Sequence, residues 1–168
     1  MTVQEAAQLA PMATATVALT AVVVATIGIA VQRIIARKRA AVDIFLKTEM
    51  DKHLVEAWDA LELAVVELRA ASSVESFCSE SRYKEHYLNM RRYLSIHELI
   101  AVGIKNRMFD EGICFDFWGD AIERHFKSTC DVIEYIRRQP HHLTPFLEFE
   151  RLSLRWIARR AKLQAATT

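Results

Sequence analysis

Residues 11–31 contain no charged side chain, and this stretch limits what the chain can be more than any other feature. A transmembrane helix needs about 20 mostly apolar residues, because about 30 Å of hydrocarbon is crossed at about 1.5 Å per residue. The stretch has that length, so we predict a transmembrane helix over residues 11–32. The alternatives are a cleaved signal peptide and a buried core helix. Core helices are usually shorter, which argues against the second alternative.

Basic residues follow the apolar stretch at once and predict its orientation: they are Arg33, Arg37, Lys38 and Arg39. A signal peptide carries its positive charge before the apolar segment, whereas residues 1–10 carry only Glu5 and the terminal amine. The positive-inside rule keeps a basic flank in the cytoplasm. We therefore predict a single pass through the cytoplasmic (inner) membrane, with residues 1–10 outside and the basic juxtamembrane segment 33–40 inside.

Small residues recur along one side of the predicted span, at Ala18, Ala21, Ala25 and Gly28. Their alternating spacing of three and four places them in one row, and small residues let transmembrane backbones approach closely. One interpretation is a homo-oligomer packed through this row. The alternative is chance, since about half of residues 11–31 are alanine, threonine or glycine.

The rest of the chain is predicted to be helical, because no proline or glycine lies between Gly28 and Gly103. No alternating run typical of strands appears after residue 31. We predict an all-α fold in which the transmembrane helix continues into a cytoplasmic domain, residues 41–162, of about four helices. A short tail, residues 163–168, follows the domain.

The first cytoplasmic helix is expected to run unbroken to about Ala70. An apolar stripe at helical spacing passes from Val42 through Leu46 and Met50 to Leu68, and it predicts a face turned to the core. The remaining helices are expected at about 74–108, 110–138 and 145–162.

Helix ends are marked by capping residues and prolines. Ser72, with a glutamate three residues later, is typical of a capping box before the second helix. Asp110 is the expected N-cap of the third helix, and Pro140 ends that helix because the residue before a proline avoids helical geometry. Thr144 and Pro145 predict the start of the last helix.

Composition and motifs exclude several functional classes. Twenty-two basic and 21 acidic residues leave a net charge of +1, which argues against a nucleic-acid-binding protein. No phosphate-binding loop, dinucleotide fingerprint or zinc-protease motif is present, and the three cysteines lack metal-site spacing. We predict no cofactor and no metal.

Histidines and one acidic face leave two weaker readings open. Asp116, Asp120 and Glu123 lie on one helix face, which is typical of a solvated surface and less often of a divalent-metal site. His141 and His142 are expected in a proline-bounded loop as solvated or capping residues.

Residues 93–118 carry the most distinctive motif. It consists of Leu94, Glu98, Ala101, Gly103, Ile104, Asp110 and Glu111, followed by Phe117 and Trp118. Here the chain resembles a bacterial family of small membrane-anchored proteins that is described only as a domain of unknown function. The family pattern has asparagine where this chain has Ser95. The apolar N-terminal span with its basic flank matches the same layout, so the resemblance covers most of the chain. It implies an architecture and no activity.

Glu98 is the motif residue that most needs a physical explanation. Apolar neighbours on the same helix place it at a part-buried position, where a carboxylate must be paired or hydrogen-bonded. The favoured interpretation is a salt bridge or a helix-end contact that joins two helices; the sharper alternative is a catalytic or ligand-binding acid. Under the favoured interpretation, Ala101 and Gly103 are small so that the helices can pack closely, and Asp110 is a helix cap. Glu111 and Trp118 complete the candidate motif.

Arginines repeat every four residues near the C-terminus, at Arg151, Arg155 and Arg159. A basic amphipathic helix can lie on an anionic membrane surface. The alternative is a solvated or intramolecular face paired with acidic residues of the domain.

We expect a membrane-anchored helical interaction or scaffold domain. Its expected partners are the lipid bilayer, an unidentified protein and, through the row of small residues, a second copy of the chain. An alternative is a membrane-acting oligomeric effector of the stress or phage-defence type. An enzyme is less favoured, and its carboxylate site would lie near Glu98, Asp110 and Asp116.

Overall fold

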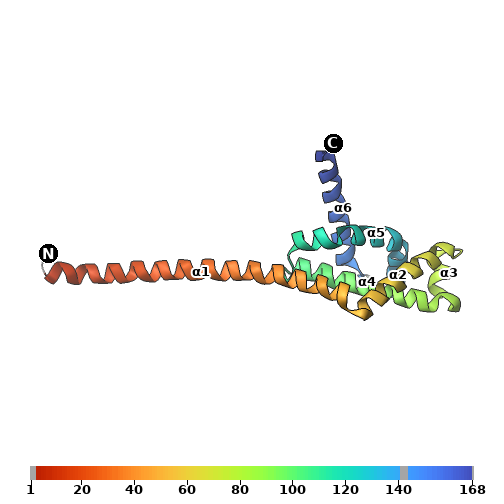
Figure 1. The fold of residues 1–168 in the computed structure, drawn as a ribbon, viewed down its shortest axis with the longest axis horizontal. Helices are drawn as coiled ribbons and strands as arrows, with labels where there is room; N and C mark the ends of the chain where they lie inside the picture. The colour runs from red at the N-terminus through yellow and green to blue at the C-terminus, as the bar shows by residue number, and fades with distance from the viewer. Residues whose placement is uncertain (1–2, 141–143, 168) are drawn as a thin grey trace. The chain divides into compact units, whose positions relative to one another are not determined.

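A computed structural model describes residues 3–140 and 144–167, with side chains described for 15–140 and 144–166. All the regular secondary structure in those two ranges is helical, with no strand, as predicted (Figure 1). The elements are α1 (Val3–Met50), α2 (Lys52–Ala70), α3 (Val74–Ser79), the 3₁₀ helix η1 (Ser81–Tyr83), α4 (Lys84–Lys105), α5 (Glu111–Arg138) and α6 (Leu147–Thr167). The chain divides into two units, residues 1–37 and 38–168. His141 and His142 lie outside the described residues.

In the first unit, α1 is the one described helix that is long and apolar enough to cross a membrane. Residues 15–36 are exposed along their whole length, large aliphatic side chains included. The hydroxyls of Thr20 and Thr26 donate to the carbonyls of Thr16 and Val22 at 2.8 and 2.7 Å. The hydrogen bonds satisfy these two polar groups within the helix, as a lipid environment requires.

The expected unbroken helix to Ala70 is wrong, because the chain bends at Asp51. Asp51 leaves helical geometry (φ −81°, ψ 113°), and its carboxylate accepts from the His53 amide at 2.9 Å. An N-cap carboxylate satisfies an amide that otherwise has no partner in the first turn, and this starts α2. Leu46 and Met50, expected in the core, are instead 46% and 80% exposed.

The expected helix over residues 74–108 is also divided, into α3, η1 and α4. The break comes at Glu80, whose backbone is extended and whose carboxylate accepts from the Ser76 hydroxyl. The N-cap of α3 is Ser73 rather than Ser72, and its hydroxyl oxygen accepts from the Ser76 amide at 3.1 Å. The turn buries Phe77 against Tyr83, with ring centroids 5.6 Å apart.

The turn between α4 and α5 is a Schellman motif followed by a cap. The Met108 amide donates to the Gly103 carbonyl at 2.8 Å and the Arg107 amide donates to Ile104 at 3.0 Å. Arg107 occupies the left-handed position, with φ 57°. Asp110 then caps α5 as predicted, accepting from the Ile113 amide at 3.1 Å. α5 ends at Arg138, just before Pro140, which is also as predicted.

The last helix begins later and ends later than predicted. It starts at Leu147 instead of Pro145, because Phe146 adopts a positive φ of 59° and is buried. Arg137 donates from Nε to the Pro145 carbonyl at 3.0 Å, which fixes the turn before α6. The expected tail is helical as far as Thr167.

The core of the second unit lies where α2, α4, α5 and α6 meet. Helix α2 packs along α4, and α6 crosses the bundle in contact with both α4 and α5 (Figure 1). The largest fully buried side chains come from all four helices and from α3: Leu61, Phe77, Met90, Leu94, His97, Ile100, Ile122, Ile133, Ile136, Phe149, Leu152 and Trp156. Two histidines in or beside this core, His97 and His125, are buried.

Candidate functional site

Glu98 joins α4 to the beginning of α6. Its carboxylate accepts from the Phe149 amide at 2.7 Å through Oε2 and from the Glu148 amide at 3.3 Å through Oε1. These amides belong to the first turn of α6, where backbone donors have no partner within the helix. Glu98 therefore acts as a cap for a helix that begins some fifty positions later in the chain. The arrangement is a helix-end contact, and it occupies both oxygens of the carboxylate.

A second carboxylate of the motif holds the middle of α6. Glu111, in the first turn of α5, accepts from Trp156 Nε1 at 3.1 Å and from Arg155 Nε at 3.0 Å. Trp156 is 1% exposed, so its indole N–H needs this partner. Lys105 adds an ion pair with Glu148 at 2.8 Å, between the end of α4 and α6.

The small residues and the tryptophan of the motif are packing residues. Ala101 is buried in α4. A Cβ at Gly103 would overlap the ring of Phe109, which folds back over the end of α4. Trp118 is 5% exposed, and its ring meets that of Phe45 edge-on at 6.0 Å. Of the motif residues, Glu98 and Glu111 are the two that attach α6 to α4 and α5.

Two of the three acidic residues singled out on α5 make ion pairs. Asp120 pairs with Arg160, and Glu123 pairs with Arg160 at 3.0 Å and with Lys127 at 2.6 Å. Asp116 is exposed. Within the described residues, no group of three histidine, cysteine or carboxylate side chains is arranged to hold a metal.

The three arginines singled out on α6 each have a partner in the domain. Arg151 pairs with Glu148 at 2.9 Å, Arg155 pairs with Glu111, and Arg159 lies 4.1 Å above the ring centroid of Phe115. These contacts support the intramolecular reading of the basic face.

Sequence reasoning missed a hydrogen-bonded row of three polar side chains from α2, α5 and α4, in which the two histidines are buried and Glu62 is partly exposed. His125 Nε2 lies 3.3 Å from Glu62 Oε1, and His125 Nδ1 lies 2.8 Å from His97 Nε2. The two histidines are 1% and 2% exposed. Both fall on the apolar stripes of their helices, a signal that was available in the sequence.

The hydrogen bonds along this row of three side chains decide which imidazole nitrogens carry a proton. With His125 Nε2–H donating to the Glu62 carboxylate, His125 Nδ1 is left as an acceptor for the proton of His97 Nε2. His97 Nδ1 then keeps a lone pair, and within the described residues it has no hydrogen-bond partner. Burial lowers the pKa of His125 to about 4, against the opposing pull of Glu62. Burial and the neighbouring His125 lower the pKa of His97 well below its usual value.

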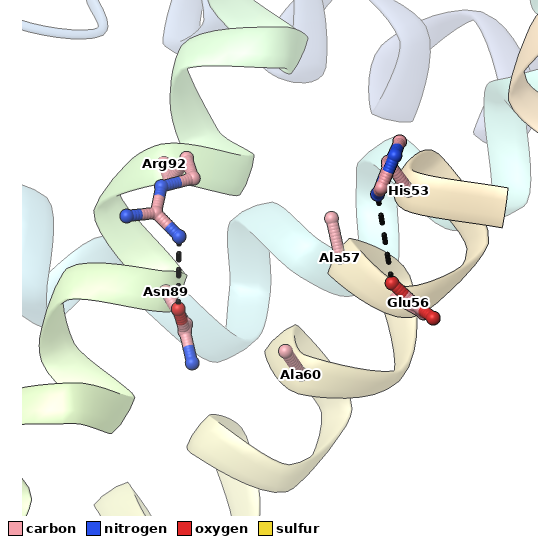
Figure 2. Close-up of a pocket in the computed structure, with 6 residues that line it drawn as sticks. All are labelled: His53, Glu56, Ala57, Ala60, Asn89 and Arg92. Carbon is pink, nitrogen blue, oxygen red and sulfur yellow. Dashed lines mark hydrogen bonds and ion pairs between the residues drawn. The ribbon is translucent and has the colours of Figure 1, made fainter. Parts of the chain in front are cut away.

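A surface hollow lies between α2 and α4. It has a volume of about 330 Å³, and Figure 2 shows Arg92 and Asn89 on one wall facing His53 and Glu56 on the other. The two alanines of α2 form the floor between the walls: Ala57 and Ala60. A second hollow of about 440 Å³ adjoins it and shares Asn89 and Arg92. Both lie outside the motif.

The row of small residues on α1 faces away from every large aliphatic side chain of the helix. At 3.6 residues per turn, the valines, leucine and isoleucines of residues 15–36 leave free a sector of about 120°. Ala18, Ala21, Ala25 and Gly28 fall in this sector, and a Cβ added at Gly28 would meet no atom within 4 Å. The basic residues Arg33, Arg37, Lys38 and Arg39 continue on the same helix.

No match was found among curated proteins or among solved structures. The family comparison, by contrast, matches residues 15–156, which include the apolar part of α1, the whole motif and α6 as far as Trp156. The chain therefore belongs to the family described as a domain of unknown function, DUF4760.

Proposed function

We propose that this protein is a single-pass anchor whose helical domain acts as an interaction module at the cytoplasmic face of the inner membrane. One observation carries the proposal: α1 exposes large aliphatic side chains around two thirds of its circumference, without a charge from residue 15 to residue 32. A surface of this kind is stable in lipid and costly in water. The basic residues that follow support the N-out, C-in orientation.

The motif supports an interaction role rather than catalysis. Its carboxylates Glu98 and Glu111 accept hydrogen bonds from α6, and Asp110 accepts from the first turn of α5. These contacts build one rigid arrangement of α4, α5 and α6. A rigid helical surface held at the membrane is suited to binding another protein.

In-cell cross-linking followed by mass spectrometry tests the proposal, with the span intact. We expect cross-links from exposed residues of the domain to one or a few membrane-proximal proteins. The matched control replaces Val22, Val23 and Val24 with lysine, which keeps the domain and prevents insertion. Cross-links that are unchanged in this control, or absent from the native chain, contradict the proposal.

A second candidate is a membrane-acting oligomer, and the sector of small residues on α1 favours it. Close packing of two or more spans through Ala18, Ala21 and Ala25 would bring the helices together in the bilayer. Overexpression should then slow growth and release a trapped dye. Leucine at these three positions should abolish both effects, whereas leucine at Thr16, Thr20 and Thr26, on other faces of the helix, should not. Equal leakage from both triple variants contradicts this candidate.

A further inference from the structure

The basic cluster that follows the apolar stretch of α1 has no carboxylate partner among the described residues. It consists of Arg33, Arg37, Lys38 and Arg39, and the Nε of Arg37 also lacks a hydrogen-bond acceptor within that part of the chain. No aspartate or glutamate lies between Glu5 and Asp43 in the sequence. The fixed charge at this end of the apolar stretch is therefore of one sign, and it favours an anionic ligand.

The basic residues of α6 differ in this respect. Arg151 lies 2.9 Å from Glu148, and Arg155 lies 3.0 Å from Glu111. An exposed pair of this kind is weak, but its carboxylate repels an anion that approaches the arginine. The basic cluster on α1 carries no such carboxylate, so an anion is attracted there without opposition.

The position of the basic cluster along α1 indicates which anion is within reach. As helix, residues 11–32 extend over about 33 Å, close to the thickness of the hydrocarbon layer. Arg33 then lies where the lipid headgroups begin, and Arg37 lies about 6 Å further along the helix. The headgroup layer on each side of a bilayer is about 5–7 Å deep. Both guanidinium groups are therefore within reach of lipid phosphates.

The side of α1 that carries Arg33 and Arg37 continues into the apolar stretch as an aliphatic surface. The two arginines are four residues apart, so they share one face of the helix. Ile29 and Val22 lie on the same face, about one and three turns before Arg33, and are 53% and 62% exposed. A lipid whose headgroup contacts the arginines can therefore lay an acyl chain along both aliphatic side chains.

We propose that Arg33 and Arg37 bind the headgroup of an anionic phospholipid, with Lys38 and Arg39 adding positive charge close by. The planar guanidinium fork matches the oxygens of a phosphodiester. Each basic residue near an anionic membrane surface strengthens the attraction about fivefold. This inference rests on the proposed membrane anchor and names the lipid chemistry that the anchor selects.

Lipid contacts are measured with the full chain in vesicles of nine parts phosphatidylcholine and one part phosphatidylglycerol. A photo-reactive residue replaces Ala36, which lies between the two arginines in the chain, and mass spectrometry identifies the lipids that become attached. We expect phosphatidylglycerol among the adducts at about fivefold or more above its share of the vesicle lipid. A native chain whose adducts only match the vesicle composition overturns the inference.

Two double variants assign the enrichment to residues. Arg33→Gln with Arg37→Gln should remove most of it, and Lys38 and Arg39 keep a basic flank that supports insertion of this variant. Arg151→Gln with Arg155→Gln is the matched control on α6 and should retain the native enrichment. Equal loss in both double variants overturns the inference, because a general effect of positive charge would then explain the result.

Two further measurements on the same vesicles separate the lipid site from a free-anion site and from the proposed function. Inorganic phosphate added at constant ionic strength should leave the enrichment unchanged, and phosphate that abolishes it overturns the lipid site. Extraction with alkaline carbonate shows whether the chain is inserted. A chain that resists extraction but enriches no anionic lipid leaves the anchor role standing and overturns the lipid site, whereas a chain that is extracted contradicts both.

Discussion

Acidification to pH 5 should destabilise the helical domain through His125 and His97, the two buried histidines that are linked to Glu62. In the unfolded protein these histidines have a pKa near 6.5, whereas burial lowers the pKa of folded His125 to about 4. A histidine with a lowered folded pKa binds its proton more weakly in the folded state. Its contribution is therefore intact above pH 6.5 and is lost as the pH falls from 6.5 toward 4.

The size of the effect at pH 5 follows from how far this pH lies below the unfolded pKa while it stays above the folded one. At pH 5 the unfolded His125 is protonated and the folded one is not, and the interval of about 1.5 units between pH 5 and the unfolded pKa corresponds to about 2 kcal/mol of lost stability. The lowered pKa of His97 acts in the same direction. Two kcal/mol is a large share of the 5–15 kcal/mol by which typical domains are stable, so the loss is measurable.

Urea unfolding of the full chain in detergent, at pH 7.5 and at pH 5, measures this loss. Tryptophan fluorescence follows the unfolding of the domain, and one of the three tryptophans, Trp58, lies beside the site, with its ring centroid 4.7 Å from that of His125. The double variant His97→Phe, His125→Gln should show a pH dependence smaller by at least about 2 kcal/mol. His53→Gln, which removes an exposed histidine, is the control and should retain the native dependence. A native protein as stable at pH 5 as at pH 7.5 refutes the reasoning.

Three further predictions concern helix ends. Glu98→Ala should lower the free energy of unfolding by about 1–2 kcal/mol, because two first-turn amides of α6 lose their acceptor. Hydrogen exchange at the Phe149 amide should become faster, and unchanged exchange there would contradict the capping role. Gly103→Ala should cost about 1–3 kcal/mol in the same urea assay, because the new methyl group overlaps Phe109, whereas Gly28→Ala should leave domain stability unchanged. Arg107→Gly should raise stability by about 0.5–1 kcal/mol in thermal unfolding, because glycine adopts the left-handed conformation at φ 57° without the cost of a side chain; a lower melting temperature would count against this reason.

Features that depend on neighbouring residues were predictable from the sequence. The helical content, the Asp110 cap and the end of α5 before Pro140 all follow from the propensities of a few adjacent side chains. Ser72 and Ser73 show the limit of such reasoning, since both are good caps and only the packing of Phe77 and Tyr83 decides between them. Asp51 could equally have been an exposed residue in the middle of a helix.

Features that depend on distant residues were not predictable in detail. Glu98 was expected to make a salt bridge or a helix-end contact, but the sequence could not show that the contact is with the start of α6, because the partner amides lie far along the chain. The start of α6 shifted because Phe146 is buried in a positive-φ conformation, which is a tertiary effect. His97 and His125 occupied apolar stripe positions, yet only the packing of α4 on α5 brings them into contact.

Membrane retention of the native chain tests the central claim most directly. One portion of the membranes from expressing cells is washed with alkaline carbonate. A second portion, kept as sealed spheroplasts with the outer face of the inner membrane exposed, is treated with protease before and after lysis. The account predicts that the protein stays in the membrane fraction and that residues 38–168 are cut only when protease reaches the cytoplasmic face. Release of the intact protein by carbonate, or digestion of the helical domain from the outer face, would contradict it.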